Sequence, residues 1–376
     1  MVWSAYKHTL ELVDRSGVAS VEWDRLIIST GAIDRVIPFK GWTAPGVFTL
    51  GGAQIALKHQ ACAVGVHPVF LGTGPLLYLV AYQYLVAGVR PRAVLDTAPA
   101  TASFAALGGL LCSKRAFLRG LFYLGRLRAA GVPMKSGVRP IEAVTGTDGA
   151  IAGLRWRNAK GTDRTTECDA LAFGYGLKPE TQLADLVELP FAFDPRQRQW
   201  LPIRDEAGRA GRDGVYLAGD GAAIEGAEAA ELTGARAAHA VLLDLGRRES
   251  APQIEGLNRK LKRLERFRDA LDRQVFPFPA CLARAIGDDV MICRCEGTTA
   301  GDIRHAARTL GARDINRAKA FTRLGMGRCQ GRICAAAAAE LLADASGMPL
   351  AGIGRLRGQA PIKPVSTAMF LEGGQS

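Results

Sequence analysis

Four of the eight cysteines stand in two close pairs, Cys293/Cys295 and Cys329/Cys334, whereas the other four occur singly. The resulting spacing is C-x-C-x33-C-x4-C. Two pairs of thiolates from two loops can surround a [2Fe-2S] cluster or a tetrahedral zinc ion. Structural zinc sites usually place about two to four residues between paired cysteines, so the single residue between Cys293 and Cys295 favours the cluster. A zinc site and four thiols that bind no metal remain as alternatives.

The residues around the second pair also suit a cluster. The segment GMGRCQGRIC places Gly325, Gly327 and Gly331 beside the two thiols. There the backbone can approach closely, and its N–H groups can hydrogen-bond to sulfur. Cys334 opens an alanine-rich run that predicts a helix, and the positive end of a helix stabilises a thiolate.

A second group of residues could bind a dinucleotide. Gly72, Gly74 and Pro75 follow an apparent buried strand and open a predicted helix, which is the setting of a phosphate-binding turn. Leu77 replaces the third glycine of the fingerprint, so the motif fits a turn that merely packs a helix on a sheet equally well. Asp96 lies 24 residues beyond Gly72, where a carboxylate can accept ribose hydroxyls, and it favours NAD or another adenine nucleotide over NADP.

Two further stretches resemble the flavin motifs of two-dinucleotide-binding-domain flavoproteins. LIISTGA (26–32) is similar to their strand that ends in Ala-Thr-Gly. VYLAGDGA (215–222) is similar to their Gly-Asp motif, in which the resemblance assigns Asp220 to the ribityl chain or a flavin-proximal phosphate. The cofactor-binding residues that the resemblance implies are Thr30, Gly31, Ala32, Gly219, Asp220 and Gly221.

The same resemblance implies FAD as a cofactor. It also shows that the sequence lacks one motif of these flavoproteins. Such flavoproteins carry a G-x-G-x-x-G loop on their opening strand, and none occurs in the stretch before Thr30. We therefore expect a chain shortened at its N-terminus, without part of the cradle for the FAD adenosine diphosphate. The expected flavin domain contains no C-x4-C pair, so disulfide reductase chemistry is not expected.

The elements that must position these residues alternate between strands and helices, which predicts an α/β architecture. The apolar run Leu26–Ile28 is expected to be a strand buried on both faces. Residues 64–89 carry no charge, but glycines and a proline at 72–75 break the run, so it predicts a buried strand, a turn and a helix and not a membrane span. Residues 254–275 carry one apolar stripe at helical spacing.

The predicted domains follow from these motifs. We expect an FAD-binding domain at 1–62 and 168–246, with an inserted NAD-type nucleotide-binding domain at 63–167. A basic helical connector at 247–284 and a [2Fe-2S]-binding domain at 285–350 follow. The Gly- and Pro-rich residues 351–376 are expected to form a tail that packs on the protein or is disordered.

The four-cysteine segment resembles a known module. CRCE followed by RLGMGRCQGRIC is similar to the [2Fe-2S]-binding module named after the bacterioferritin-associated ferredoxin, and its ligand positions correspond to Cys293, Cys295, Cys329 and Cys334. Thr298 or Thr299 is expected to cap a helix that ends at Gly311.

Over nearly its whole length, the chain resembles the FAD-dependent α subunits of heteromeric amine and opine dehydrogenases. That family includes subunits of opine oxidase, of hydroxyproline and proline dehydrogenases, and of hydrogen cyanide synthase. The resemblance rests on residues 30–54, the Gly72–Pro75 turn, residues 214–238 and the cysteine module. It implies that a glycine-oxidase-like flavoprotein subunit oxidises the C–N bond of an opine, imino acid or amino acid, while this subunit forwards the electrons. A small ferredoxin-like subunit is a further implied partner.

The sequence itself supplies no catalytic dyad, so the catalytic residues stay unassigned. The alternatives are a stand-alone NAD(P)H-dependent FAD and iron–sulfur oxidoreductase and a non-catalytic nucleotide-binding subunit. Residues 247–332 carry 19 Lys/Arg and 10 Asp/Glu, and so supply +9 of the formal net charge of +12, but no nucleic-acid-binding signature accompanies them. Without a secretory signal or a membrane span, we expect a cytoplasmic protein that meets a membrane only through its complex.

Overall fold

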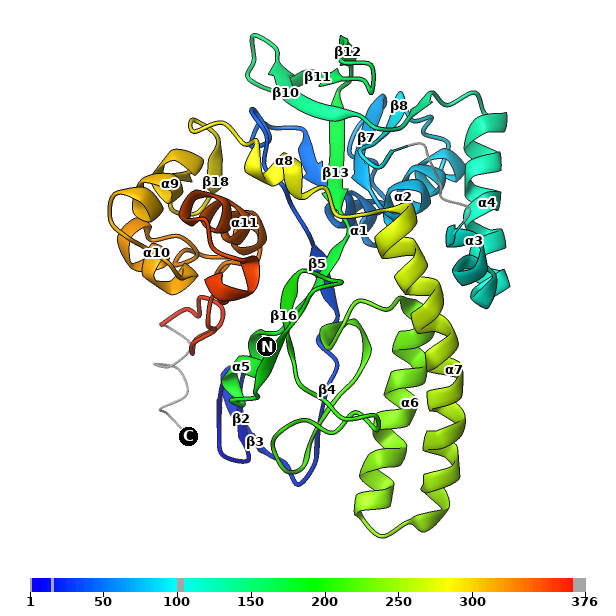
Figure 1. Cartoon of the computed structure of the whole chain (residues 1–376), viewed down its shortest axis with the longest axis vertical. Helices are drawn as coiled ribbons and strands as arrows, with labels where there is room; N and C mark the ends of the chain where they lie inside the picture. Colours follow the sequence, from blue (N-terminus) through cyan, green and yellow to red (C-terminus); the bar gives the residue numbers. More distant parts are fainter. Residues whose placement is uncertain (1, 15–16, 100–104, 368–376) are drawn as a thin grey trace.

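The computed structural model describes residues 2–14, 17–99 and 105–367. Its upper part in Figure 1 is built on a five-stranded, wholly parallel sheet of order β6-β13-β7-β8-β9. Every residue of the three inner strands, β13, β7 and β8, is buried, as parallel strands covered on both faces require. The strands are β6 (Val47–Thr49), β7 (Pro68–Thr73), β8 (Ala93–Asp96), β9 (Met134–Lys135) and β13 (Ala170–Tyr175).

Helices and an antiparallel meander complete this part. The uncharged run at 64–89 forms β7, a tight turn and helix α2, which confirms the predicted strand, turn and helix. None of the described helices has the length and apolar character needed to cross a membrane. The helices are α1 (Leu50–His59), α2 (Pro75–Val86), α3 (Ala105–Leu110) and α4 (Lys114–Ala129), and the meander strands are β10 (Arg139–Thr145), β11 (Ile151–Arg157) and β12 (Asp163–Glu167).

The lower part of Figure 1 holds the second αβ unit. Strand β4 (Leu26–Ile28) runs parallel to β17 (Val215–Leu217), and helix α6 (Ala227–Asp244) follows β17. The expectation that β4 is buried on both faces fails at Ile27, which is 40% exposed, because β17 is its only strand partner among the described residues. Small antiparallel units surround this pair: β1 (Val2–Tyr6), β2 (Thr9–Asp14) and β3 (Gly17–Glu22), then β15 (Phe191–Asp194) and β16 (Gln199–Pro202).

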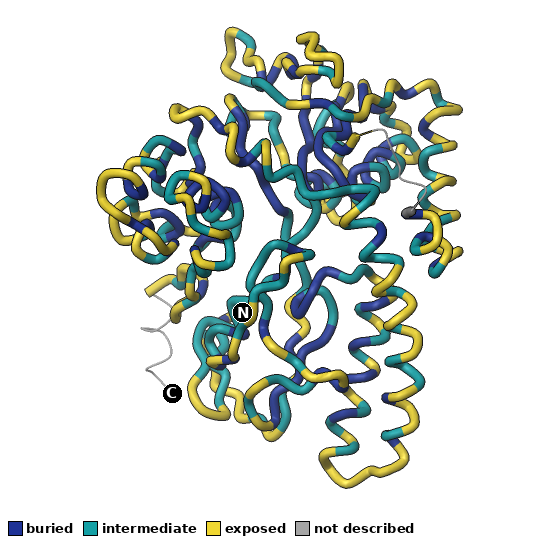
Figure 2. Tube along the Cα trace, in the orientation of Figure 1, coloured by how far each residue is buried: buried dark blue, intermediate teal, exposed yellow. Residues whose placement is uncertain are grey.

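Two short strands join the two parts. Strand β5 (Ala32–Asp34) pairs antiparallel with β14 (Leu177–Pro179), and the pair crosses the middle of the molecule in Figure 1. Helix α5 (Gln182–Leu186) follows β14. On the other side, α6 packs along α7 (Ala251–Ala270), whose predicted apolar stripe is half-buried and continues into a π-helical turn, Leu271–Val275. The tips of α6 and α7 are the exposed end of the molecule in Figure 2.

The C-terminal residues form a small helical domain on the opposite side of the β5–β14 pair from α6 and α7 (Figure 1). Thr299 caps α9 with a capping box to Asp302, which confirms the predicted cap. The core of this domain is continuous with the five-stranded sheet, and the Trp42 indole donates to the carbonyl of Met291 at 2.7 Å. Its elements are α8 (Ala280–Arg284), β18 (Met291–Cys293), β19 (Thr298–Thr299), α9 (Ala300–Arg308), α10 (Ile315–Thr322), α11 (Ala335–Ser346) and a 3-10 turn, Leu350–Ile353.

The first half of the expected tail packs on the protein. Gly358 N–H donates to the Asp185 carboxylate at 2.9 Å, and Ile362 N–H donates to the carbonyl of Trp3 at 3.3 Å. Residues 368–376 of the expected tail lie outside the described residues.

The turn after β7 generates a stability prediction. A Cβ at Gly72 would lie 1.7 Å from the carbonyl oxygen of Gly174 in β13, whereas a Cβ at Gly88 would meet nothing within 4 Å. Both glycines have positive φ. We expect Gly88→Ala to lower the free energy of unfolding by about 1 kcal/mol. Gly72→Ala should cost several times more or prevent folding, and equal losses in denaturant titrations would contradict this steric explanation.

Candidate functional site

The four paired cysteines converge from two loops of the helical domain. Cys293 ends β18, and Cys334 stands at the N-terminus of α11. Both are 1% exposed, Cys329 is half-buried and Cys295 is exposed. The thiols contact one another in the order Cys293, Cys334, Cys329, Cys295. The structure therefore brings the predicted ligands together.

Hydrogen bonds among the thiols distribute their protons unequally. The Cys334 thiol lowers the pKa of Cys293 to about 6 and that of Cys329 to about 5, because it hydrogen-bonds to both sulfurs. The same two bonds raise the pKa of Cys334. Two of the four sulfurs are thus stabilised as thiolates, which is the form that binds metal.

Backbone N–H groups point at the sulfurs as the sequence predicts. Those of Gly325 and Glu296 hydrogen-bond to Cys293, and those of Gly331 and Ile333 hydrogen-bond to Cys329. These four thiols and their N–H donors fit an iron–sulfur cluster. Within the described parts of the chain, no group of three or more His, Cys, Asp or Glu side chains has the spacing of a metal site, and the four thiols instead lie close enough to hydrogen-bond to one another.

One predicted glycine has a steric role in this arrangement. A Cβ at Gly327 would lie 2.2 Å from the Cβ of Cys295, so only glycine allows the two loops to meet there. The glycine at position 327 is therefore explained by the close approach of the two cysteine loops, which the sequence predicts.

The two flavin-like motifs also meet. They follow β4 and β17, and these paired parallel strands end at the same edge. A Cβ at Gly221 would lie 2.5 Å from Oγ1 of Thr30 and 3.0 Å from the backbone nitrogen of Gly31. The Asp220 carboxylate accepts the N–H groups of Glu225 at 3.0 Å and of the next residue at 3.1 Å. This turn leads into α6.

The start of α6 suits an anionic group. Gly226 is its N-cap residue, with φ of 96° and no side-chain cap for the first N–H groups. Such a helix end attracts phosphate. Gly219 has φ of 65° in the turn that precedes it. The motif residues therefore present close backbone contacts and a free helix end, which fit a flavin dinucleotide.

Glu180 joins the flavin-like motif to the cysteine loop, and no sequence pattern reveals it. Its N–H donates to the carbonyl of Gly31 at 2.9 Å, and its own carbonyl accepts the hydroxyl of Thr30. Its carboxylate forms a half-buried ion pair with Arg332, which lies between Cys329 and Cys334. Ala32 lies beside this contact, because it pairs in the β5–β14 ladder with Pro179, the residue before Glu180. One residue thus touches both candidate cofactor sites.

Lys178 on β14 interacts electrostatically with the cysteine site from the other domain. Burial lowers its pKa, while the charges of Cys334, Glu180 and Cys329 act in the opposite direction. No sequence pattern singles out this lysine. Its role depends on the pairing of β14 with β5, which brings the strand beside the cysteine loop.

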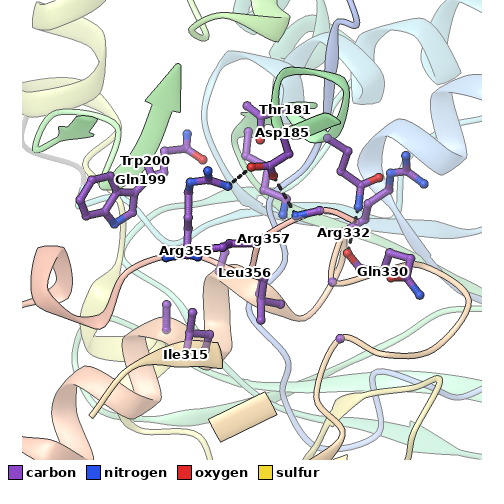
Figure 3. A pocket seen from close by; sticks show the side chains of 18 of the residues that line it. Thr181, Asp185, Gln199, Trp200, Ile315, Gln330, Arg332, Arg355, Leu356 and Arg357 are labelled. Atoms are coloured by element: carbon purple, nitrogen blue, oxygen red, sulfur yellow. Dashed lines mark hydrogen bonds and ion pairs between the residues drawn. The ribbon is translucent and has the colours of Figure 1, made fainter. Parts of the chain in front are cut away.

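A cavity of about 130 Å³ opens beside this contact (Figure 3). Lys178 and Arg332 line it, as does Gln330, whose carbonyl accepts the Gln182 side chain at 3.0 Å. In Figure 3, Asp185 and Arg355 point toward one another across the cavity and form an ion pair. The cavity walls therefore come from the β14 region, the cysteine loop and the segment after residue 353.

A buried ion pair docks the helical domain on the rest of the protein. Glu340 on α11 is 1% exposed and accepts two hydrogen bonds from Arg198, at 2.9 and 2.7 Å. Arg35 is 4.0 Å from the same carboxylate and stacks over the ring of Phe278 at 3.6 Å. Burial lowers the pKa of Arg35 to about 10, so it stays charged at neutral pH.

The predicted dinucleotide turn is also assembled. Gly74 is the N-cap of α2, Pro75 is its first residue, and Gly72 lies opposite Asp96 on β8. Asp96 is 3% exposed, and its two oxygens accept the N–H of Ala98 at 2.8 Å and the hydroxyl of Tyr78 at 2.7 Å.

Burial raises the pKa of Asp96. Close packing of β7 on β13 explains Gly72 without a ligand. Nucleotide binding at this turn stays a prediction.

Comparisons with known proteins cover most of the chain. Residues 291–344 match the family described as BFD-like [2Fe-2S] binding domain. The chain is 38% identical over 354 residues to the opine oxidase A subunit of Rhizobium meliloti, covering 93% of this chain and 66% of that protein. It is 36% identical to the opine oxidase A subunit of Agrobacterium tumefaciens, covering 93% and 69%. It is also 36% identical to hydrogen cyanide synthase subunit HcnB of Pseudomonas aeruginosa, covering 93% and 76%.

A solved structure shares the fold. The crystal structure of L-proline dehydrogenase from P. horikoshii aligns with a TM-score of 0.67 and 20% identity, covering 96% of this chain and 61% of that chain. The chain thus spans about two thirds of the length of the first relatives it matches. These findings confirm the predicted α/β fold and the [2Fe-2S] domain at its C-terminal side.

The cysteine assignment has a direct test. Changing any one of Cys293, Cys295, Cys329 or Cys334 to serine should abolish the visible absorption of the reconstituted cluster, because each supplies one sulfur ligand. Cys281→Ser is the matched control, since this exposed cysteine lies on α8 of the same domain. A cluster spectrum that survives one of the four substitutions unchanged would refute that ligand.

Proposed function

Because this chain belongs to the family of the opine oxidase A subunits and hydrogen cyanide synthase subunit HcnB, we propose that it is the electron-transferring subunit of a heteromeric oxidoreductase. A partner flavoprotein subunit of the glycine-oxidase-like class oxidises the C–N bond of an opine, imino acid or amino acid. This chain receives the electrons and passes them on. A small ferredoxin-like subunit is a second candidate partner.

The geometry supports an assignment of residues to each cofactor. We assign the [2Fe-2S] cluster to Cys293, Cys295, Cys329 and Cys334, where it supplies one-electron storage. We assign FAD to the edge where β4 and β17 end. Its pyrophosphate is placed at the N-terminus of α6, near Asp220. The close approach of Gly221 to Thr30 supports this placement.

The observation that carries the proposal is the position of Glu180. It holds Thr30 and Gly31 through its backbone and Arg332 through its carboxylate. Arg332 lies within the loop that carries Cys329 and Cys334. The flavin motif and the cluster loop both contact Glu180 and therefore lie close together, as electron transfer between two cofactors requires.

A stand-alone NAD(P)H oxidoreductase is the second candidate, because the β7–α2 turn has the form of a nucleotide site. The engagement of both Asp96 oxygens within the protein favours the electron-transfer subunit, since those oxygens would have to exchange partners to bind a ribose. A non-catalytic nucleotide-binding subunit is the third candidate, and stoichiometric FAD released by acid would exclude it.

Anaerobic reduction distinguishes the first two candidates. We expect NADH alone to leave the visible spectrum of the purified holoprotein unchanged, because the chain receives its electrons from a partner subunit. Co-purified complex should bleach when the amine or amino-acid substrate is added. Rapid bleaching of the isolated chain by NADH would contradict the proposal and support the stand-alone enzyme.

Lys178 provides a test of the contact between the two sites. Reduction adds negative charge to the cluster, and a nearby cation stabilises that form. We expect Lys178→Met to lower the midpoint potential of the cluster, measured by EPR-monitored titration, while its absorption spectrum is retained.

Lys319→Met is the matched control. Lys319 lines the same cavity and carries the same charge, but Lys178 is the cation on which Cys334 and Cys329 act. Equal potentials in Lys178→Met and the unsubstituted protein would contradict the placement of Lys178 against the cluster.

A further inference from the structure

The cysteine site has an inner side and an outer side. Cys293 and Cys334 are 1% exposed, and Cys334 faces Lys178 on β14. Cys295 is the exposed ligand and sits in the turn after β18. A cluster held by these residues therefore meets the flavin side through Cys334 and approaches the solvent through Cys295.

Three exposed arginines lie on the segments that carry the outer ligands or next to them. Arg294 precedes Cys295, Arg328 precedes Cys329, and Arg323 extends from the C-terminus of α10. Arg294 is held over the ring of Trp42 at 5.5 Å, which fixes its position beside the ligand turn. We call Arg294, Arg323 and Arg328 the arginine face.

One carboxylate lies at this face, and it is already paired. Glu296 is 16% exposed in its side chain and accepts a 2.7 Å hydrogen bond from Arg323. Arg294 and Arg328 form no ion pair with an acid among the described residues, and their charge is therefore available to a partner. The face thus carries an excess of positive charge next to the exposed ligand.

The chemistry of the face indicates the class of partner. Electron-transfer encounters are small and depend on opposite charges that steer the two proteins together. Exposed large apolar side chains are few among the described residues of this domain. They are Leu310 and Phe321, which offer little apolar surface for binding a membrane. Arginine is also the cation that protein interfaces favour.

We infer that the arginine face docks an acidic one-electron carrier protein, which takes electrons from the cluster at the Cys295 side. This inference rests on the proposed function and adds the route by which electrons leave. The reduced cluster gives one electron to the oxidised carrier, so the cluster returns to its oxidised form and the carrier is reduced by one electron. No bond forms or breaks, and no proton is transferred.

The test uses two haem proteins of opposite charge as probes. The full chain is reconstituted with its cluster, reduced anaerobically with dithionite, freed of excess reductant and mixed in a stopped-flow instrument. The acidic probe is the oxidised soluble domain of cytochrome b5, and the basic probe is oxidised cytochrome c. Haem absorbance reports the rate, and isothermal titration of the oxidised proteins reports binding.

The variant that tests the face is Arg294→Glu/Arg328→Glu. Its control is Arg259→Glu/Arg263→Glu, which makes the same charge change at exposed positions on α7. We expect the face variant to slow reduction of cytochrome b5 by about tenfold at low salt and to weaken its binding, because steering depends on opposite charge. The control should leave the rate of cytochrome b5 reduction and its binding unchanged. Added salt should slow the reduction of cytochrome b5 by the unsubstituted protein.

Other outcomes would overturn the inference. If the rate of cytochrome b5 reduction changes neither with added salt nor in the face variant, the arginine face docks no acidic carrier. Faster reduction of cytochrome c than of cytochrome b5 at low salt would reverse the predicted charge preference. Binding to anionic phospholipid vesicles that is lost in the face variant would assign the face to a membrane instead.

The proposed function is judged separately in the same preparation. A chain that shows the visible absorption of the cluster and is reduced by dithionite keeps the proposed function even when the docking inference fails. A chain that forms no cluster refutes both.

Discussion

The arrangement of the two candidate cofactor sites depends on one contact, in which Glu180 binds the flavin-like motif with its backbone and the cysteine loop with its carboxylate. The ion pair with Arg332 is part-buried, so removing one partner would leave the other charge partly shielded from water and unpaired, which costs stability. This cost holds the loop of Cys329 and Cys334 in place against β14. The contact therefore fixes the relative positions of the two sites as well as the local fold.

A second ion pair supports the same arrangement. Glu340 of α11 is bound by Arg198, between β15 and β16, and lies near Arg35, the residue after β5. The helix that follows Cys334 is therefore attached to the rest of the protein at a second point. The core beneath it is shared with the five-stranded sheet. Because burial of paired charges gives little net stability but strongly specifies position, these ion pairs are best understood as fixing the orientation of the helical domain.

Features that depend on neighbours in the sequence were predictable, and features that depend on distant pairs were not. The cap at Thr299, the helix after Cys334 and the β7–α2 turn follow from short-range patterns, and the structure contains all three. Glu180 pairs with a residue 152 positions away, and Arg198 with one 142 positions away, so no local pattern reveals either. The exposure of Ile27 was missed because an apolar run does not tell how many strands flank it.

The central claim is that electrons pass between a flavin at the β4–β17 edge and a cluster on the helical domain. Anaerobic photoreduction of the flavin in the FAD- and cluster-loaded chain, followed by freeze-quenching and EPR, tests it most directly. We predict that the spectrum of a reduced [2Fe-2S] cluster appears as the flavin is reduced. A reduced flavin beside a cluster that stays oxidised, although dithionite can reduce it, would contradict the claim.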